Sequence, residues 1–336
     1  MESESKKETV RKVQSTAGGA FLITIPKEWV SKIGIREGGH VHMELEEEDL
    51  VISPVNRRQS AQSRPLDIDK VRDRKMLDLS IGASYMQGHD VTEIVSKSMI
   101  LPEQKRWIRE TVDNLIGVEV AEEFSDRVVL QNLVDPRMFD LDAQMTKFSQ
   151  SSLAVLNDAL IGLEKGDRDL AEDAYERGFQ STKLYKLLVR LILQIMRNRK
   201  LRGELKGYDV DGLLTRMLAV KDLGRCAYYS YRVAQHVTEL ATTTESGILT
   251  SVRRMVNATM WMQQEAFEAF VRKDLEKASA VIDRMDEVRK HYEAVFAGLS
   301  KGKVESLPFS LIIRDIRGVA AYAVALADDA VLAAFG

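Results

Sequence analysis

The sequence predicts a mainly α-helical protein with a small β part, built from successive regions of different pattern. Residues 8–55 hold short apolar strands separated by glycine turns, and residues 66–139 alternate helix and strand patterns. Residues 140–336 place apolar side chains at three- and four-residue spacing through six long segments. With 45% apolar and 29% charged residues in 336, the chain is typical of a globular protein with several domains.

The composition limits the classes of function. A formal net charge of -3 does not favour polyanion binding over the whole surface, so that a nucleic-acid site must be a local basic patch. The single cysteine, Cys226, excludes a disulfide framework and a thiolate metal cluster and favours a reducing, cytoplasmic location. There is no apolar run of about 18 residues, so we expect no insertion into a membrane.

Residues 8–55 are expected to form two small strand pairs and one short helix. The apolar patterns predict strands at Val10–Val13, Ala20–Ile25, Val41–Leu45 and Leu50–Ser53. Pro26 starts the helix because it cannot donate to a ladder, and Gly34 ends it. A region this small cannot bury much apolar area alone, which predicts a homodimer that shares one core.

This region resembles the AbrB/SpoVT swapped-hairpin DNA-binding domain. The resemblance rests on motifs in the family's order over about 45 residues: VRKV at Val10–Val13, a strand running into Ile25-Pro26, KEW at Lys27–Trp29, Ile33-Gly34-Ile35 and the Gly38-Gly39 turn. It implies an intertwined homodimer, joined through this N-terminal domain, that places a basic face on DNA.

The region departs from that family at two points. Val30 and Ser31 stand where related regulators often carry an arginine pair, and the loop Gln14–Gly19 is longer and holds no arginine. Arg11 is the one family-type basic residue that carries over directly. Nearby charge alone adds four candidates for contact with DNA phosphates, which are Lys12, Lys27, Lys32 and Arg36. The alternative is that all five are ordinary solvated charges, and the acidic run Glu44–Asp49 would oppose DNA on a shared face.

Residues 56–65, NRRQSAQSRP, lack periodicity and are predicted to be a linker. The region 66–139 that follows is expected to be a small α/β unit without a phosphate loop or a catalytic grouping. Its predicted elements are helices at Ile68–Met86 and from Pro102 to near Gly117, a strand at Val91–Val95, and a hairpin of Val118–Phe124 and Arg127–Leu133. The His89-Asp90 pair beside Gly88 is interpreted as a turn feature rather than an acid–base pair.

The helical region contains an internal repeat of two three-helix bundles, residues 140–242 and 243–336. The sequences KGDRDLAEDAYER at Lys165–Arg177 and RKDLEKASAVIDR at Arg272–Arg284 stand at matching places in the two copies. The predicted helices are Phe148–Leu163, Leu170–Arg199, Leu213–Ala241, Ile248–Val271, Leu275–Leu299 and Phe309–Phe335, with a loop at Gly203–Gly212.

Over about 195 residues this region resembles the phosphate-uptake regulator (PhoU) fold of tandem three-helix bundles. The third helix of each bundle carries that family's signature, usually close to K-D-L-E-R-I-G-D-x-A, here as Lys221–Tyr228 and Arg314–Ala323. The order of the two resemblances along the chain is similar to an archaeal arrangement.

The signature's carboxylates are missing, which predicts that the family's multinuclear metal clusters are absent. In the family, a Glu and an Asp four residues later share a helix face and can hold a metal through oxygen ligands. Here those positions are Gly224 and Tyr228 in one copy and Arg317 and Ala321 in the other. No metal and no cofactor is therefore expected, and Asp222 and Asp315 are expected to pair with Arg or Lys.

Basic residues offer a different site in the same helices. Lys221 with Arg225, and Arg314 with Arg317, are about one helical turn apart and form forks that could bind phosphate or a nucleotide. The alternative is ion pairing with acids that face them, namely Glu172, Asp173, Asp283 and Asp286. His236 and His291 stand isolated on their helices and are interpreted as packed or surface residues.

The sequence favours a cytoplasmic, dimeric DNA-binding regulator whose helical region sets the geometry of the dimer or receives a signal tied to phosphate status. The alternative is a signalling adaptor that docks on a phosphate transporter or a kinase, with the N-terminal domain serving only for dimerisation. An enzyme is not supported, because the sequence shows no nucleophile–base pair, metal cluster or phosphate loop, and no catalytic residue is assigned.

Overall fold

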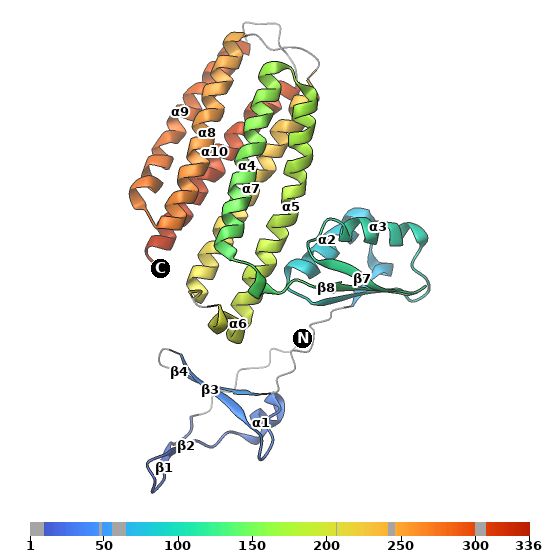
Figure 1. Ribbon diagram of the computed structural model, residues 1–336, viewed down its shortest axis with the longest axis vertical. Coiled ribbons are helices and arrows are strands. Elements are labelled where there is room, and N and C mark those ends of the chain that lie inside the picture. The colour runs from blue at the N-terminus through green and yellow to red at the C-terminus, as the bar shows by residue number, and fades with distance from the viewer. Residues whose placement is uncertain (1–9, 47–48, 56–64, 206, 241–245, 300–306) are drawn as a thin grey trace. The chain divides into compact units, whose positions relative to one another are not determined.

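The computed structural model describes residues 10–46, 49–55, 65–205, 207–240, 246–299 and 307–336 (Figure 1). The chain forms two compact units, Met1–Ser60 and Ala61–Gly336. The predicted linker at 56–65 lies outside the described residues except for Pro65, as do residues 47–48 in the predicted acidic turn. The prediction of a mainly helical chain with a small β part is confirmed.

The first unit consists of two strand pairs separated by one helix. Strand β1 (Gln14–Ser15) pairs antiparallel with β2 (Phe21–Leu22), and β3 (Val41–Glu46) pairs antiparallel with β4 (Asp49–Pro54). The predicted first strand at Val10–Val13 is wrong, since these residues are irregular and the strand falls within the segment expected to be a loop. Among the described residues, neither β1 nor β2 has a second neighbouring strand that would extend its ladder.

Helix α1 (Lys27–Ile33) follows the local signals in the sequence. It begins directly after Pro26 and ends at Gly34, which adopts the left-handed conformation with φ of 77° and ψ of 21°. Only glycine takes that conformation without a steric penalty from Cβ. The Gly34 amide donates to the Val30 carbonyl and closes the helix end. The predicted helix is therefore confirmed at both ends.

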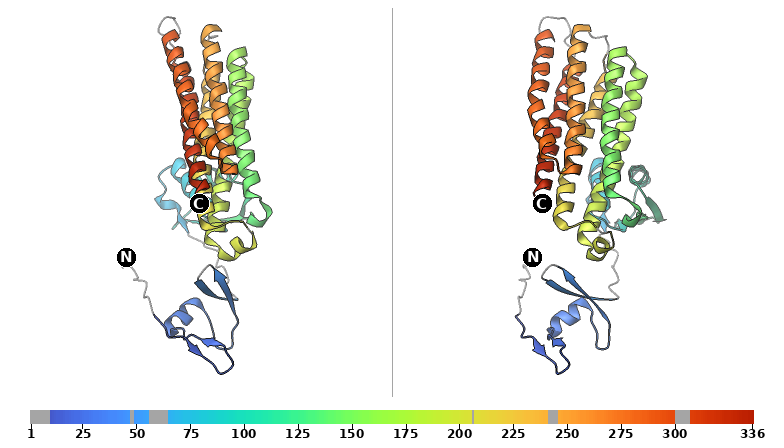
Figure 2. Two further views of the ribbon diagram at one scale, coloured as in Figure 1. Left: turned by 90° about the vertical axis from the view of Figure 1, so that its left-hand side faces the viewer. Right: turned by 60° about the vertical axis from the view of Figure 1, so that its left-hand side comes forward.

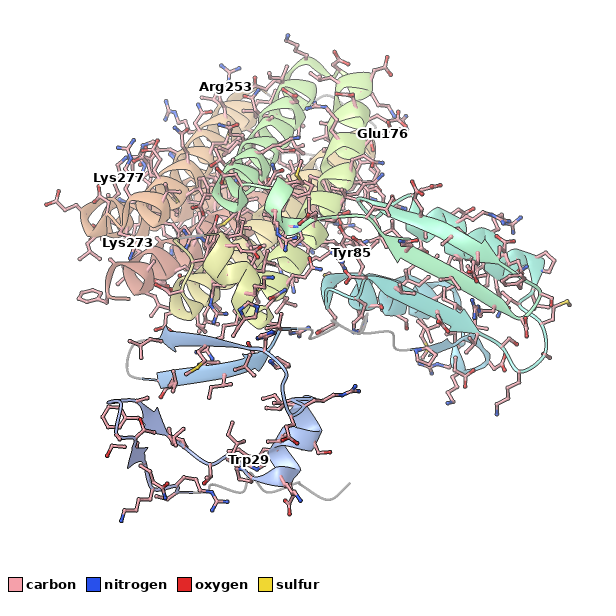
Figure 3. All side chains as sticks on the ribbon, turned by 60° about the horizontal axis from the view of Figure 1, so that its bottom comes forward. Trp29, Tyr85, Glu176, Arg253, Lys273 and Lys277 are labelled. Carbon is pink, nitrogen blue, oxygen red and sulfur yellow. The ribbon has the colours of Figure 1, made fainter. Side chains whose placement is uncertain are left out.

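The first unit has no interior of its own. None of its described side chains is buried, although many of them are large and apolar (Figure 3, where Trp29 is labelled). Phe21 is 75% exposed, Met43 60% and Leu45 79%, and Trp29 is still 41% exposed. An apolar surface of this kind is usually covered by a partner.

The second unit begins with a four-stranded sheet and two helices. Its elements are β5 (Leu66–Asp67), a 3-10 turn (Ile68–Lys70), α2 (Arg74–Met86), β6 (Val91–Val95), α3 (Pro102–Val112), β7 (Val118–Glu123), β8 (Arg127–Asn132) and a 3-10 turn (Pro136–Met138). The strand order is β5-β6-β8-β7, with β5 parallel to β6 and the other neighbours antiparallel. The predicted strand at Val91–Val95, the predicted hairpin and the predicted helix start at Pro102 are confirmed. Helix α2 begins later than predicted because Asp73 caps it, accepting from the Met76 amide at 2.8 Å.

Long helices form the rest of the unit (Figures 1 and 2). They are α4 (Leu141–Lys165), α5 (Arg168–Arg197), the short α6 (Arg199–Glu204), α7 (Val210–Thr238), α8 (Ser246–Arg272), α9 (Leu275–Leu299) and α10 (Leu307–Ala334). Helix α6 occupies part of the predicted loop, where Asn198 accepts from the Leu201 amide and caps it. Helix α7 packs on α10 and α4 on α8, so that one apolar core runs through both bundles.

The two helical hairpins of the repeat turn with the same backbone conformation. The turn between α4 and α5 has Gly166 at φ of 64°, and the turn between α8 and α9 has Lys273 at φ of 56°. In each, the next residue is an aspartate that caps the second helix, accepting from the amide three residues on at 3.0 Å. Lys273 is the only described non-glycine residue with positive φ.

Arg190 of α5 attaches the small α/β region to the helices. Its side chain is fully buried and donates to the carbonyls of Tyr85 and His89 at 2.9 and 2.8 Å and to the Asp90 carboxylate at 3.0 Å. Its guanidinium also lies 5.2 Å from the centre of the Tyr85 ring. Burial raises the pKa of the Tyr85 hydroxyl to about 12. Asp90 is thus a partner of Arg190, and the two regions are joined by a buried polar contact.

No helix in the part of the chain that the structure describes combines the length and the apolar character that crossing a membrane requires.

Candidate functional site

The residues predicted to contact DNA lie on the surface of the first unit. Arg11 and Lys12 precede β1 in an extended segment, Lys27 and Lys32 stand at the two ends of α1, and Arg36 follows in the next turn. All five side chains are exposed. The short helix therefore carries a lysine at each end, in a region that also exposes its apolar residues.

The two copies of the helical signature lie on antiparallel, contacting helices. The Cys226 thiol of α7 lies 3.7 Å from the Val319 carbonyl of α10, and the side chains of Asp315 and His236 meet at 3.4 Å. A shift of 93 residues along the sequence brings Asp222 onto Asp315 and His236 onto Asp329. The same shift brings Tyr229 onto Tyr322, and these rings stack on each other at 5.8 Å. The α7–α10 contact is thus nearly two-fold symmetric.

Aromatic packing occupies the first pair of signature positions. A Cβ atom at Gly224 would come within 2.8 Å of the Tyr185 ring, so a glutamate there would displace that ring. Tyr228, at the second position, is 40% exposed and packs edge-on against Tyr229 and Tyr231, with ring centres 5.3 Å apart in both cases.

The second pair of positions is also occupied by groups that do not bind metals. The Arg317 guanidinium lies 5.0 Å from the centre of the Tyr292 ring of α9, and Ala321 offers no ligand atom. Within the described ranges no three His, Cys, Asp or Glu side chains are grouped so as to hold a metal ion.

Asp315 lies in a buried polar cluster at one end of the α7–α10 contact. Its carboxylate is fully buried, and Arg314 contacts it through Nε at 2.8 Å and Nη2 at 2.7 Å. On α7, Arg232 donates to His236 Nε2 at 3.0 Å, and the other ring nitrogen lies 2.9 Å from Glu239. Since guanidinium only donates, Nε2 accepts and Nδ1 carries the proton shared with Glu239. His236 is therefore buried, in agreement with its interpretation as a packed residue. It does not stand isolated on its helix, because it takes part in this polar network.

The opposite end of the same contact has a different composition. The register set by the Tyr229–Tyr322 and His236–Asp315 contacts places Asp222 of α7 opposite Asp329 of α10. Asp329 is 9% exposed, and its Oδ2 is buried without a hydrogen-bond partner. The sequence prediction missed Asp329 and the role of His236. The 93-residue shift was the available signal, because it pairs these two positions with the signature aspartates.

The four residues of the predicted anion site do not converge. Arg314 is held by its neighbour Asp315, and Arg317 covers Tyr292, whereas Lys221 and Arg225 are exposed near Asp222. Two of the four acids proposed as alternative partners bind other arginines, since Asp173 binds Arg177 and Asp286 binds Arg289. Asp222 and His236 are 14 residues apart on α7, so the two forks lie about 20 Å apart.

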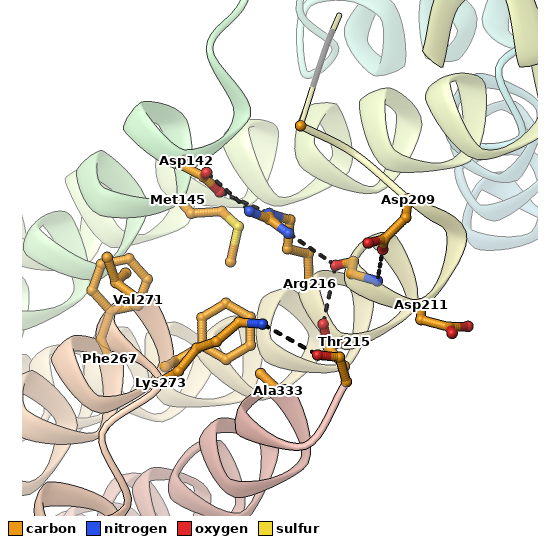
Figure 4. Close-up of a pocket in the computed structure, with 14 residues that line it drawn as sticks. Asp142, Met145, Asp209, Asp211, Thr215, Arg216, Phe267, Val271, Lys273 and Ala333 are labelled. Atoms are coloured by element: carbon orange, nitrogen blue, oxygen red, sulfur yellow. Dashed lines mark hydrogen bonds and ion pairs between the residues drawn. The ribbon is translucent and has the colours of Figure 1, made fainter. Parts of the chain in front are cut away.

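A pocket of about 200 Å³ lies where the ends of α4, α7, α8 and α10 meet (Figure 4). In its wall Arg216 binds Asp142 through two hydrogen bonds of 2.8 and 3.1 Å, and Lys273 Nζ lies 3.5 Å from the Gly336 carbonyl. Its apolar lining includes Met145, Phe267, Phe270 and Ala333. No residue predicted from the sequence to bind DNA or an anion is among the described residues that line it.

The fold and the repeated signature define a protein of tandem three-helix bundles that is preceded in the chain by a swapped-hairpin type of domain. The PhoU domain model matches residues 145–237 and 252–330, just over half of the chain. The chain belongs to the PhoU family. Residues 14–60 match the model described as antidote-toxin recognition MazE, bacterial antitoxin, so that an AbrB/MazE-like domain stands at the N-terminus.

Three relatives illustrate the likeness of the helical region. A Clostridium acetobutylicum protein described as a phosphate-specific transport system accessory protein PhoU homolog is 21% identical over 180 residues, which are 52% of this chain and 81% of that protein. The crystal structure of PhoU from Pseudomonas aeruginosa has a TM-score of 0.51 and 21% identity, covering 57% of this chain and 94% of that one. The corresponding values for PhoU from Streptococcus pneumoniae are 0.48, 20%, 57% and 91%.

Proposed function

We propose that this protein is a cytoplasmic, dimeric DNA-binding transcription regulator whose helical region responds to phosphate status. The observation that carries the proposal is the first unit, which exposes its large apolar side chains and, among the residues that the structure describes, buries none. Two copies that cover these side chains with each other would form one shared core, the arrangement that the swapped-hairpin resemblance implies.

The DNA contact is assigned to five exposed basic residues. Arg11 and Lys12 precede β1, Lys27 and Lys32 flank α1, and Arg36 follows it. In a dimer this set occurs twice, so that the dimer carries ten of these basic residues. Contacts of this kind position a protein on the DNA backbone and weaken as salt displaces them.

The link to phosphate is assigned to the helical region. It belongs to the PhoU family, and the Clostridium relative carries the name of a phosphate transport accessory protein. The proposal is that binding of a transporter or signalling partner, or a change within the bundles, alters the geometry of the N-terminal dimer.

A gel-shift titration on the promoter of the protein's own gene tests DNA binding. The wild type is expected to shift the fragment at low salt and to lose affinity as salt rises. The variant Arg11→Ala, Lys27→Ala should bind much more weakly. A matched control is Arg289→Ala, Lys290→Ala on α9, which removes the same charge from exposed positions of the second unit and should leave the shift unchanged.

The second candidate function is a signalling adaptor without DNA contact. The helical match favours it, since the named relative is an accessory protein of transport. In that case the wild type would bind no promoter fragment at low salt, while the first unit would still dimerise. Cross-linking in cells would then recover a transporter or kinase component with the wild type and with the Arg11→Ala, Lys27→Ala variant alike.

A further inference from the structure

The α7–α10 contact joins the two bundles of the repeat. Helix α7 is the third long helix of the first bundle and α10 the third of the second, and they pack along much of their lengths. The nearly two-fold arrangement places one signature aspartate near each end of this contact, with Asp315 opposite His236 and Asp222 opposite Asp329. The two ends of the contact can therefore be compared with each other within one protein.

The Asp315 end has cations that balance its buried charge. Arg314 binds the carboxylate directly, and Arg232 approaches it from α7 at 3.9 Å. The 93-residue shift places Ala325 where the other copy has Arg232. The Asp222 end consequently lacks the arginine that reaches across the contact at the Asp315 end.

At the Asp222 end two acids face each other across the α7–α10 contact. An ionised carboxylate can only accept, so the two carboxyl groups can bind each other by a hydrogen bond only when one of them keeps its proton. The charged groups that act on the pair are Lys221, Arg225 and Asp328, and all three side chains are exposed. Asp329 itself is 91% covered, and its Oδ2 has no partner among the described residues.

We propose that Asp222 and Asp329 form a proton-binding site that controls how tightly the two helical bundles are held together. The inference goes beyond the proposed DNA-binding function, because it concerns only the helical region and stands whether or not the first unit binds DNA. When the shared proton is bound, the pair joins α7 to α10. When it is lost, two negative charges face each other inside the contact and favour its opening.

The proton is exchanged in a physiological range of pH. Burial is the largest cause that raises the pKa of Asp329, followed by the nearby charge of Asp222, and together they bring it to about 7 from 3.8. Burial also raises the pKa of Asp222. Because the folded form holds the proton more tightly than the unfolded form, its stabilisation is complete below pH 3.8 and is lost as the pH rises to about 7. Acidification should therefore tighten the contact.

Hydrogen exchange of the full-length protein, measured by mass spectrometry at pH 5.0 and 7.5 and corrected for intrinsic rates, tests the site. The wild type should show opening of the segments around residues 219–226 and 325–332 that increases between tenfold and a hundredfold from pH 5.0 to 7.5, since each pH unit between the two pKa values changes it by about tenfold. In Asp329→Asn, whose amide can still donate to Asp222, the opening should not depend on pH.

The control variant is Asp328→Asn, which removes the same charge from the neighbouring exposed position. That charge is one of the smaller causes of the raised pKa of Asp329, so the pH dependence of the wild type should persist. Segments around His236 and Asp315 should show no such difference between the variants. The proposal is overturned if Asp329→Asn keeps the pH dependence of the wild type, or if Asp328→Asn loses it. It is also overturned if a divalent cation added at pH 7.5 restores protection in the wild type but not in Asp329→Asn, because the pair would then be a cation site.

Discussion

The two units of this chain differ in how far they bury their apolar side chains. The second unit buries them in one core through both bundles and in a second core between the small sheet and its helices. The first unit leaves Phe21, Met43 and Leu45 more than half exposed and buries none of its described residues. The second unit therefore has the cores to be stable within one chain, whereas the first, in our proposal, completes its core with a second copy.

The largest expected effect is the loss of the dimer when a charge is placed on the exposed apolar surface of the first unit. Phe21→Asp should weaken self-association about a hundredfold or more, since truncating a buried aromatic side chain typically costs about 3–5 kcal/mol. Sedimentation velocity over a range of protein concentrations measures this change directly.

The matched control for that variant is Phe335→Asp in the second unit, because Phe335 is 80% exposed and Phe21 is 75% exposed. The control should keep the dimer, and its stability should change by no more than about 0.5 kcal/mol, as expected for a surface position. If both variants remained dimeric, the proposed difference between the units would be wrong.

A smaller effect, confined to the second unit, is expected from loss of its buried arginine. Arg190→Met would leave the carbonyls of Tyr85 and His89 without their donor, and we expect the free energy of unfolding to fall by about 3 kcal/mol. Urea denaturation followed by circular dichroism measures the change. Arg197→Met, an exposed arginine on the same helix, is the control and should cost less than about 1 kcal/mol.

The smallest effect compares the two hairpin turns of the repeat. Lys273 adopts the backbone conformation that Gly166 adopts in the other copy, and a side chain there costs about 1 kcal/mol. Lys273→Gly should therefore raise the melting temperature by about 2–4 °C, and Gly166→Lys should lower it by a similar amount. Calorimetry of both variants measures the shifts, and a lower melting temperature for Lys273→Gly would show that the lysine side chain stabilises the fold.

Much of the fold was predictable from local signals in the sequence. Pro26 and Gly34 fix the ends of α1, and the apolar spacing predicts each long helix. The strands of the first unit were not placed correctly, because the pairing of such short segments depends on neighbours that local sequence does not specify. The hydrogen bonds of the buried Arg190 side chain were also not predicted, since their acceptors lie about 100 residues earlier in the chain.

For the helical site, the sequence predicted only that the signature positions lack the family's carboxylates. The identities of Gly224, Tyr228, Arg317 and Ala321 are enough to remove the family's carboxylates, and the structure adds that Tyr185 occupies the space beside Gly224. The pairing of Asp222 with Asp329 depends on two helices that meet antiparallel. Helical periodicity gives the faces of each helix but not the register between them.

In our proposal this protein binds DNA and responds to phosphate. The decisive experiment is a map of the DNA bound by the protein in cells grown with abundant and with limiting phosphate. We expect bound sites near genes of phosphate uptake, with an occupancy that changes between the two conditions and is lost in the Arg11→Ala, Lys27→Ala variant. A map without reproducible sites in either condition would contradict it.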